Sequence, residues 1–168
     1  MKLSRSSFVF GLLAGLLFAI PAFAQTRTFS DPNFEFTFEI PEERWKVVSK
    51  TPNVNLVFAT AKEGDLEIRK LTVPTNKAIS DVMKSEEEKL FLRPGFVAGK
   101  DENFNGALRG AIYNFEYVNA GRPMSGRFYF LRSGEIVYVL RFTAYTNNLR
   151  SLRTQTDLIA RTFQVKKS

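Results

Sequence analysis

The side chains that most often perform chemistry in proteins are scarce in this sequence of 168 residues, which contains neither histidine nor cysteine. Without an imidazole or a thiol, a Ser-His-Asp triad, a cysteine nucleophile, a zinc finger and a disulfide framework are all excluded. The sequence also lacks a Walker loop, a G-x-G-x-x-G fingerprint and a Ser-x-x-Lys pair. We therefore expect no catalytic residues and no cofactor. The alternative is a hydrolase or lyase that uses carboxylate and tyrosine groups in a cleft between sheet and helix.

Three groups of carboxylates are candidates for metal binding or acid-base chemistry. The consecutive glutamates at 86–88 fall on a predicted helix, where neighbouring side chains diverge by about 100°, so we interpret them as a solvated helix face. Glu63 and Asp65 flank a glycine as in a calcium loop, but the EF-hand pattern is missing and turns favour the same residue types. A weak metal site there stays open. Glu35 and Glu39 alternate with apolar residues and are interpreted as the wet face of a strand.

Basic residues are concentrated in the C-terminal half of the chain. Residues 25–103 carry 12 basic and 14 acidic side chains, whereas residues 104–168 carry 10 basic and 3 acidic ones and all five tyrosines. This imbalance favours a surface that faces an acidic protein partner or another anionic surface. The alternative is that the arginines are scattered and only keep the protein in solution. The candidate partner-binding residues are Arg109, Arg127, Arg141, Arg150 and Arg153.

The first 24 residues are typical of a secretory signal peptide. A positive start is followed by an apolar run of 13 residues at 8–20 and by an A-x-A cleavage site, Ala22 and Ala24, before Gln25. A spanning helix needs about 20 apolar residues, and Pro21 ends this run too early. We predict cleavage before Gln25 and a bacterial protein that is periplasmic or secreted, with no transmembrane span. Export also argues against a nucleic-acid partner, and no cysteine is present to carry a lipid.

The rest of the chain shows the patterns of one mixed domain at 34–168, preceded by a polar leader at 25–33. Residues 34–40 alternate strictly between apolar and polar side chains, which predicts a half-buried strand. After Pro74 the apolar period becomes helical, with Ser80 as a predicted N-cap and Pro94-Gly95 as the end of the helix. Further strands are predicted at 45–48, 54–61, 66–73, 96–104, 108–118, 124–132 and 136–144.

The two strands at 124–132 and 136–144 are apolar without alternation, as expected where both faces of a sheet are covered. A final helix, with Thr146 as its predicted N-cap, carries one apolar stripe that can provide a cover. The order of elements predicts an α+β fold: a single antiparallel β-sheet flanked by helices, as an α/β/α sandwich.

Three stretches of the sequence resemble the PsbP-like and DcrB-like superfamily. They are the alternating strand 34–40 with its following proline and Trp45-Lys46-Val47, the glycine turn with residues 105–113, and residues 126–144 with the helix that ends at 162–165. Together they span most of residues 34–165. None of the three stretches is a catalytic signature. The resemblance implies a central antiparallel sheet with helices on both sides, and a repertoire of extrinsic or exported binding proteins, many of unknown function. Since one fold hosts many functions, the resemblance implies architecture first.

Overall fold

The structure, a computed structural model, describes residues 27–50, 54–58 and 63–166, with the backbone alone at 54–58. The predicted signal peptide lies outside the described residues, and so do its cleavage residues Ala22, Ala24 and Gln25. No helix among the described residues is long and apolar enough to cross a membrane.

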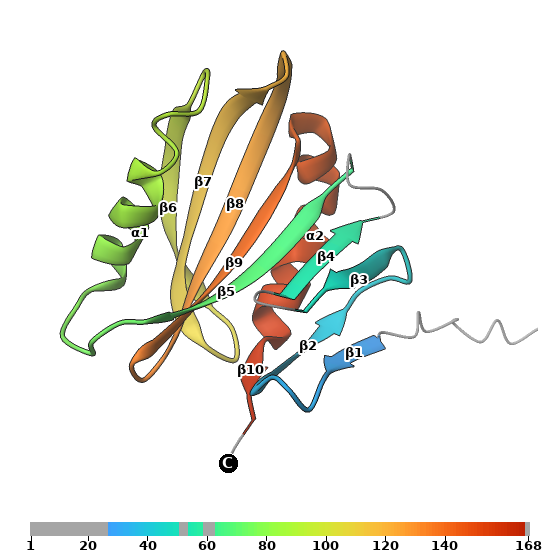
Figure 1. The fold of residues 1–168 in the computed structure, drawn as a ribbon, viewed down its shortest axis with the longest axis vertical. Coiled ribbons are helices and arrows are strands. Elements are labelled where there is room, and N and C mark those ends of the chain that lie inside the picture. Colours follow the sequence, from blue (N-terminus) through green and yellow to red (C-terminus); the bar gives the residue numbers. More distant parts are fainter. Residues whose placement is uncertain (1–26, 51–53, 59–62, 167–168) are drawn as a thin grey trace, which may run out of the picture.

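The described part of the chain forms strands and two helices in an order that follows the predicted one closely (Figure 1). The elements are β1 (Arg27–Ser30), β2 (Phe36–Ile40), β3 (Trp45–Ser49), β4 (Val54–Phe58), β5 (Asp65–Thr72), α1 (Ile79–Glu88), β6 (Val97–Asn105), β7 (Arg109–Asn119), β8 (Arg122–Ser133), β9 (Ile136–Tyr145), α2 (Thr146–Thr162) and β10 (Gln164–Val165).

The strands form two antiparallel sheets, so the prediction of a single sheet is wrong. The large sheet has seven strands in the order β3-β4-β5-β9-β8-β7-β6, and the small sheet has the order β1-β2-β10. The alternating strand β2 does not pair with its neighbour β3. It pairs instead with β1, inside the segment predicted as a leader, and with β10 at the end of the chain. Alternation identifies the buried face of a strand but not its partner, which is why the sequence did not reveal the second sheet.

Both predicted helices exist, but neither begins with the predicted cap. Ser80 and Thr146 lie inside the helices, and the N-cap positions belong to Ala78 and Tyr145, which make no side-chain cap hydrogen bond. The apolar stripes of the two helices still face the large sheet, because the spacing of three and four residues places them on one side. Periodicity therefore predicted which side of each helix is buried, although it did not predict how the helix begins.

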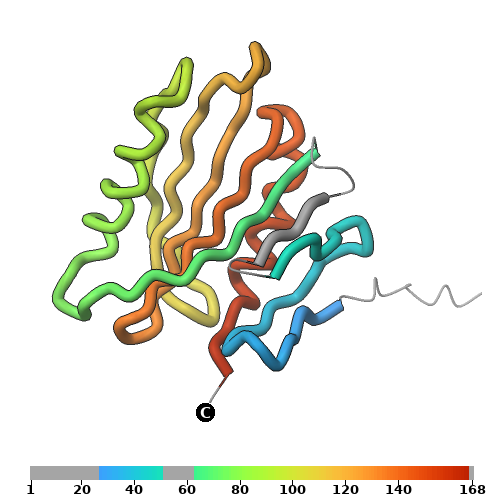
Figure 2. The backbone as a smooth tube through the Cα atoms, viewed as in Figure 1, coloured from blue at the N-terminus to red at the C-terminus, as the bar shows by residue number. Residues whose placement is uncertain are grey.

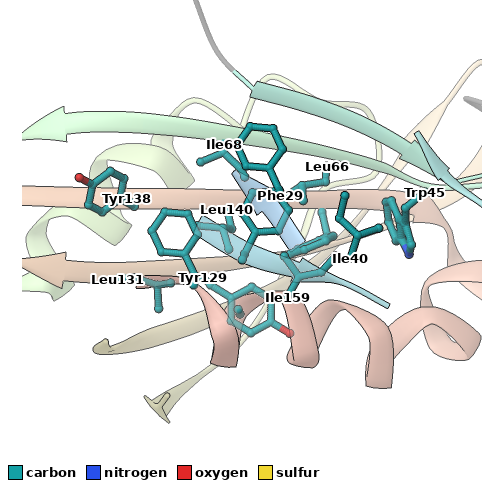
Figure 3. Close-up of a cluster of buried hydrophobic side chains, with 14 of the residues drawn as sticks. Phe29, Ile40, Trp45, Leu66, Ile68, Tyr129, Leu131, Tyr138, Leu140 and Ile159 are labelled. Carbon is teal, nitrogen blue, oxygen red and sulfur yellow. The ribbon is translucent and has the colours of Figure 1, made fainter. Parts of the chain in front are cut away.

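Both faces of the large sheet are covered, as its unbroken apolar strands predicted. Helix α2 and the small sheet cover one face, and α1 covers part of the other (Figures 1 and 2). Figure 3 shows the larger core, where side chains of the large sheet such as Tyr129 and Leu140 meet Phe29 and Ile40 of the small sheet and Ile159 of α2. Strands β8 and β9 contribute to both cores, since their successive side chains point to opposite faces.

Phe163 joins the small sheet to the large one. Its ring centroid lies 4.9 Å from that of Phe36 on β2 and 5.0 Å from that of Tyr138 on β9, and its side chain is fully buried. Glu35 makes a polar link beside it, because its carboxylate accepts a hydrogen bond of 2.8 Å from the Tyr138 hydroxyl and pairs with Lys70. The small sheet is therefore fixed by packing and by an ion pair, without sharing a strand ladder with the large sheet.

We predict that Phe163→Ala lowers the free energy of unfolding by about 3–5 kcal/mol, because it opens a cavity where the two sheets and α2 meet. The matched control is Phe91→Ala, at a ring that is 58% exposed and packs edge-on to the Phe96 ring; this change should cost about 1 kcal/mol or less. Urea unfolding monitored by circular dichroism measures both. Equal losses in the two variants would contradict the role assigned to Phe163.

Candidate functional site

A pocket of about 330 Å³ lies between α2 and the strands β6, β7 and β8. It forms where the first two turns of α2 pass over the large sheet near one end of these strands. A volume of this size suits a small ligand or a protruding group of a larger partner. The lining residues are Val97, Ala98, Gly99, Asn114, Phe115, Glu116, Ser125, Gly126, Arg127, Thr146, Leu149, Arg150 and Arg153.

The buried guanidinium of Arg127 anchors the polar part of the pocket. Its side chain is 6% exposed, and its Nη2 donates to Asp157 Oδ1 on α2 at 3.0 Å. Its Nη1 donates to Asn114 Oδ1 at 2.7 Å, and its Nε donates to the Tyr129 hydroxyl oxygen at 2.7 Å. Tyr129 in turn donates to Asp157. This network ties β7 and β8 to α2 beneath the pocket and holds Arg127 in one orientation.

The Arg127 guanidinium remains charged despite its burial. Desolvation acts to lower its pKa, but the Tyr129 oxygen and the Asp157 carboxylate more than offset that effect, so the pKa of Arg127 is raised. Burial raises the pKa of Tyr129, and the hydrogen bond to Asp157 raises it further, so the phenol stays protonated. A protonated phenol and a charged guanidinium both donate hydrogen bonds, and neither group is placed to take up a proton as a general base.

Two further arginines stand at the rim of the pocket on α2. Arg150 and Arg153 are exposed and three residues apart, so they lie on the same side of the helix. The first turn of α2 contains no acidic residue, and the Ser125 and Thr146 hydroxyls are hydrogen-bonded to each other at 3.0 Å. Glu116 is the one carboxylate among the described lining residues. The pocket is thus basic along α2.

The lining of the pocket also includes apolar residues. Val97, which is 59% exposed, comes from β6, and Leu149 comes from α2 beside Arg150. A lining that contains both basic and apolar residues suits an anionic group carried on an apolar stem.

The structure brings together three of the five arginines predicted from the sequence and separates the other two. Arg127, Arg150 and Arg153 line the pocket. Arg141 lies on the opposite face of the large sheet, where its Nη1 donates to Glu67 at 2.8 Å and its guanidinium sits 4.8 Å from the centre of the Phe128 ring. Arg109 is exposed at the start of β7, about 20 Å along the strand from the pocket. The basic half of the sequence therefore does not form one continuous patch.

Two of the three consecutive glutamates at 86–88 are engaged in structural contacts. The prediction of a solvated face at 86–88 is wrong for Glu86, which is 3% exposed and pairs with Lys89 and with Arg69 of β5. The Tyr113 hydroxyl donates to Glu87 at 2.7 Å. Helical spacing places Glu86 on the buried side together with Val82 and Met83, and basic partners compensate its charge.

The acidic segment around Gly64 forms no metal site in the described residues. Among the described residues, no group of three acidic side chains is placed to hold a metal ion. Glu67 is held by Arg141, Glu63 lines a separate pocket beside Arg44, and burial raises the pKa of Asp65. The alternation of β5 explains Asp65 and Glu67, which share one face of the strand.

Sequence reasoning missed Asp157, Asn114 and Tyr129, which hold Arg127. A weak indication was present, because Asp157 is the only carboxylate after Glu135 and it falls on a helix rich in arginine. Its pairing with Arg127 still depends on how α2 crosses the sheet, which periodicity does not define.

The architecture places the chain in a known class of α+β proteins, although no family model and no curated protein sequence matches it. PsbP (CyanoP) from Synechocystis sp. PCC 6803 is similar with a TM-score of 0.58 and 14% identity, over 86% of this chain and 95% of that one. The Ran-binding protein Mog1p from Saccharomyces cerevisiae is similar with a TM-score of 0.61 and 9% identity, over 84% and 96%. LpqN from Mycobacterium tuberculosis, involved in cell envelope biogenesis, gives 0.57 and 15%, over 85% and 91%.

These likenesses confirm the resemblance drawn from the sequence at the level of the fold. The chain has the PsbP/Mog1-like α+β fold, with antiparallel sheets and helices on both faces of the larger sheet. At identities of 9–15% the comparison does not carry over a partner or an activity.

We predict that the free energy of unfolding falls as the pH rises above about 10, the ordinary tyrosine pKa. Burial raises the pKa values of Tyr113, Tyr129 and Tyr138 in the folded state, so the unfolded chain releases phenolic protons that the folded chain retains. In Tyr129→Phe the decline should be shallower by about 1.4 kcal/mol per pH unit, the effect of one proton. Denaturant unfolding over an alkaline pH series measures it. Identical slopes would show that Tyr129 ionises normally.

Proposed function

We propose that the protein is an exported, non-catalytic binding module that recognises an acidic protein or another anionic partner through the pocket beside α2. The observation that carries this proposal is the grouping of Arg127, Arg150 and Arg153 around one open pocket. Asn114, Tyr129 and Asp157 hold Arg127 in one orientation beneath the pocket, so a bound group would meet a side chain that needs no reordering. The exposed arginines at the rim would draw an acidic partner towards the pocket.

The alternative of a carboxylate- and tyrosine-based hydrolase or lyase has weaker support. Catalysis of that kind needs two convergent ionisable groups with pKa values tuned towards neutrality. The pKa of Tyr129 is shifted upward, away from neutrality, and its hydroxyl donates to Asp157 beneath the pocket. A binding role makes use of the donors that are present and requires no base.

Export is the second part of the proposal and rests mainly on the pattern of residues 1–24. The structural likeness to LpqN, which is involved in cell envelope biogenesis, agrees with a place outside the cytoplasm. The likeness to a Ran-binding protein agrees with protein recognition as a use of this fold. The proposal is thus a periplasmic or secreted bacterial protein that binds an acidic protein without a cofactor.

The sharpest test reverses the charge at the rim of the pocket in the cell. A photo-crosslinking residue at Val97, which is 59% exposed, lines the pocket and stands opposite Glu116 in the ladder, should form an adduct with the partner. Arg150→Glu/Arg153→Glu should reduce that adduct by about tenfold or more, because like charges facing each other across an interface cost several kcal/mol. Immunoblotting and mass spectrometry measure the adduct.

The matched control is Arg109→Glu/Arg161→Glu, which makes the same change of charge at two other exposed arginines. Arg161 lies against Gly106, in the turn that precedes Arg109 at the far end of β7, so this pair is remote from the pocket. The control should retain the adduct. If both double variants lose it, net charge rather than the pocket governs binding. If the rim variant keeps the adduct, the proposal fails.

A further inference from the structure

One end of the large sheet gathers segments that are far apart in the sequence. The β7–β8 turn closes there, since Val118 pairs with Pro123, and β9 ends there, since Met124 pairs with Tyr145. The loop from α1 to β6 reaches the same end, where the Val118 amide donates to the Pro94 carbonyl at 2.7 Å. Figures 1 and 2 show the loop, the turn and the beginning of α2 at this end of the molecule.

The loop presents large apolar side chains to solvent. Leu92 is 92% exposed, Phe91 is 58% exposed, and Val97, which follows at the start of β6, is 59% exposed. Among the described residues, the other large apolar side chain with comparable exposure is Val48, on β3 at the opposite edge of the sheet. Adjacent exposed apolar side chains of this size indicate an interaction site.

The backbone of the loop is held in place, so Leu92 is a fixed projection. The Arg93 amide donates to the Leu90 carbonyl at 2.8 Å, and the Phe96 amide donates to the Arg93 carbonyl at 3.2 Å. Leu90 is buried, and the Phe91 ring packs edge-on to the Phe96 ring at 5.5 Å. The loop therefore turns Leu90 inward and Leu92 outward, and ordering it on binding would cost little.

The segment that carries this projection contains cations and no carboxylate. Residues 89–100 include Lys89, Arg93 and Lys100, and acidic residues adjoin the segment at 86–88 and 101–102. Lys89 pairs with Glu86, so Arg93 and Lys100 are the cations that this segment offers to a partner. The neighbouring β7–β8 turn adds Arg122, whose guanidinium lies 5.5 Å from the centre of the Tyr145 ring. Arg93 lies in the same way over the Tyr117 ring, at 5.7 Å. Arginine and tyrosine together suit a water–lipid boundary, because each has an apolar body and a polar end.

We propose that this end of the protein docks on an anionic phospholipid membrane, with Leu92 and Phe91 entering the boundary between headgroups and acyl chains. The flanking cations would lie among the lipid phosphates. Two exposed apolar side chains with the cations Arg93, Lys100 and Arg122 in the same segment and the neighbouring turn fit a fluid, negatively charged surface. A protein socket would instead have to supply a matching hollow and bury or pair those cations, at a desolvation cost. This role goes beyond the proposed function and would hold the pocket beside α2 next to the membrane surface.

The experiment is co-sedimentation of the mature chain with phosphatidylcholine vesicles that contain or lack phosphatidylglycerol, over a series of salt concentrations. The wild type should bind the vesicles with phosphatidylglycerol at low salt and lose binding as salt rises. Leu92→Glu should weaken that binding by about tenfold or more, because it removes the apolar side chain that would enter the membrane and adds a charge that the anionic lipids repel. Val48→Glu, the same kind of change at the other exposed position, should bind like the wild type.

Each remaining outcome decides the proposal. Leu92 is almost fully exposed, so Leu92→Glu should keep the wild-type thermal midpoint, and a loss of binding then reports the surface. If the wild type stays in the supernatant at low salt, or if Val48→Glu loses binding as Leu92→Glu does, membrane docking is overturned.

A protein adduct in cells that needs Leu92, without vesicle binding by the wild type, would assign the loop to a protein partner. Arg150→Glu/Arg153→Glu tests the pocket separately and should retain the Leu92-dependent part of vesicle binding.

Discussion

The structure depends on one constraint: strands β8 and β9 are apolar on both sides and must be covered on both. Phe128, Phe130 and Val139 face the core under α1, while Tyr129, Leu131 and Leu140 face α2 and the small sheet. Helix α2 covers only part of this face of the large sheet. The phenylalanines on the buried face of β2, Phe36 and Phe38, cover more of it. The small sheet β1-β2-β10 follows from that need, because β1 and β10 satisfy the backbone of β2 on either side.

The same constraint explains the floor of the pocket. Position 127 is on the face of β8 that looks towards α2, so an arginine there has to be buried. A buried guanidinium is tolerated only with a carboxylate and further acceptors around it, and Asp157, Asn114 and Tyr129 provide them. Arg141 on β9 stands opposite Phe128, the residue that follows Arg127 on β8. Its side chain therefore points to the other face of the large sheet. Register separates two arginines that look equivalent in the sequence.

The sequence predicted those features that are local. The alternation at 34–40 identified a buried phenylalanine face, and the missing alternation in β8 and β9 identified a sheet with two covered faces. It did not predict that β2 leaves the large sheet, that Glu86 is buried, or that Arg109 and Arg141 lie away from the pocket. Each of these depends on which segment packs against which, and residues far apart in the chain decide it, as with Glu86 and Arg69. The charge distribution of the sequence pointed to the three pocket arginines, but it did not predict that they lie around one pocket.

Antiparallel pairing also explains why a basic pocket and an apolar projection occur at the same end of the molecule. In a ladder of hairpins the connections alternate between the two ends of the sheet, so the α1–β6 loop, the β7–β8 turn and the β9–α2 junction must fall together. Val97 belongs to both features, since it lines the pocket and follows the loop that carries Leu92. The opposite end receives the β6–β7 and β8–β9 turns and has no comparable grouping of exposed large apolar side chains among the described residues. Binding features are thus concentrated at one end, while the two-sided core makes the rest of the sheet a rigid support.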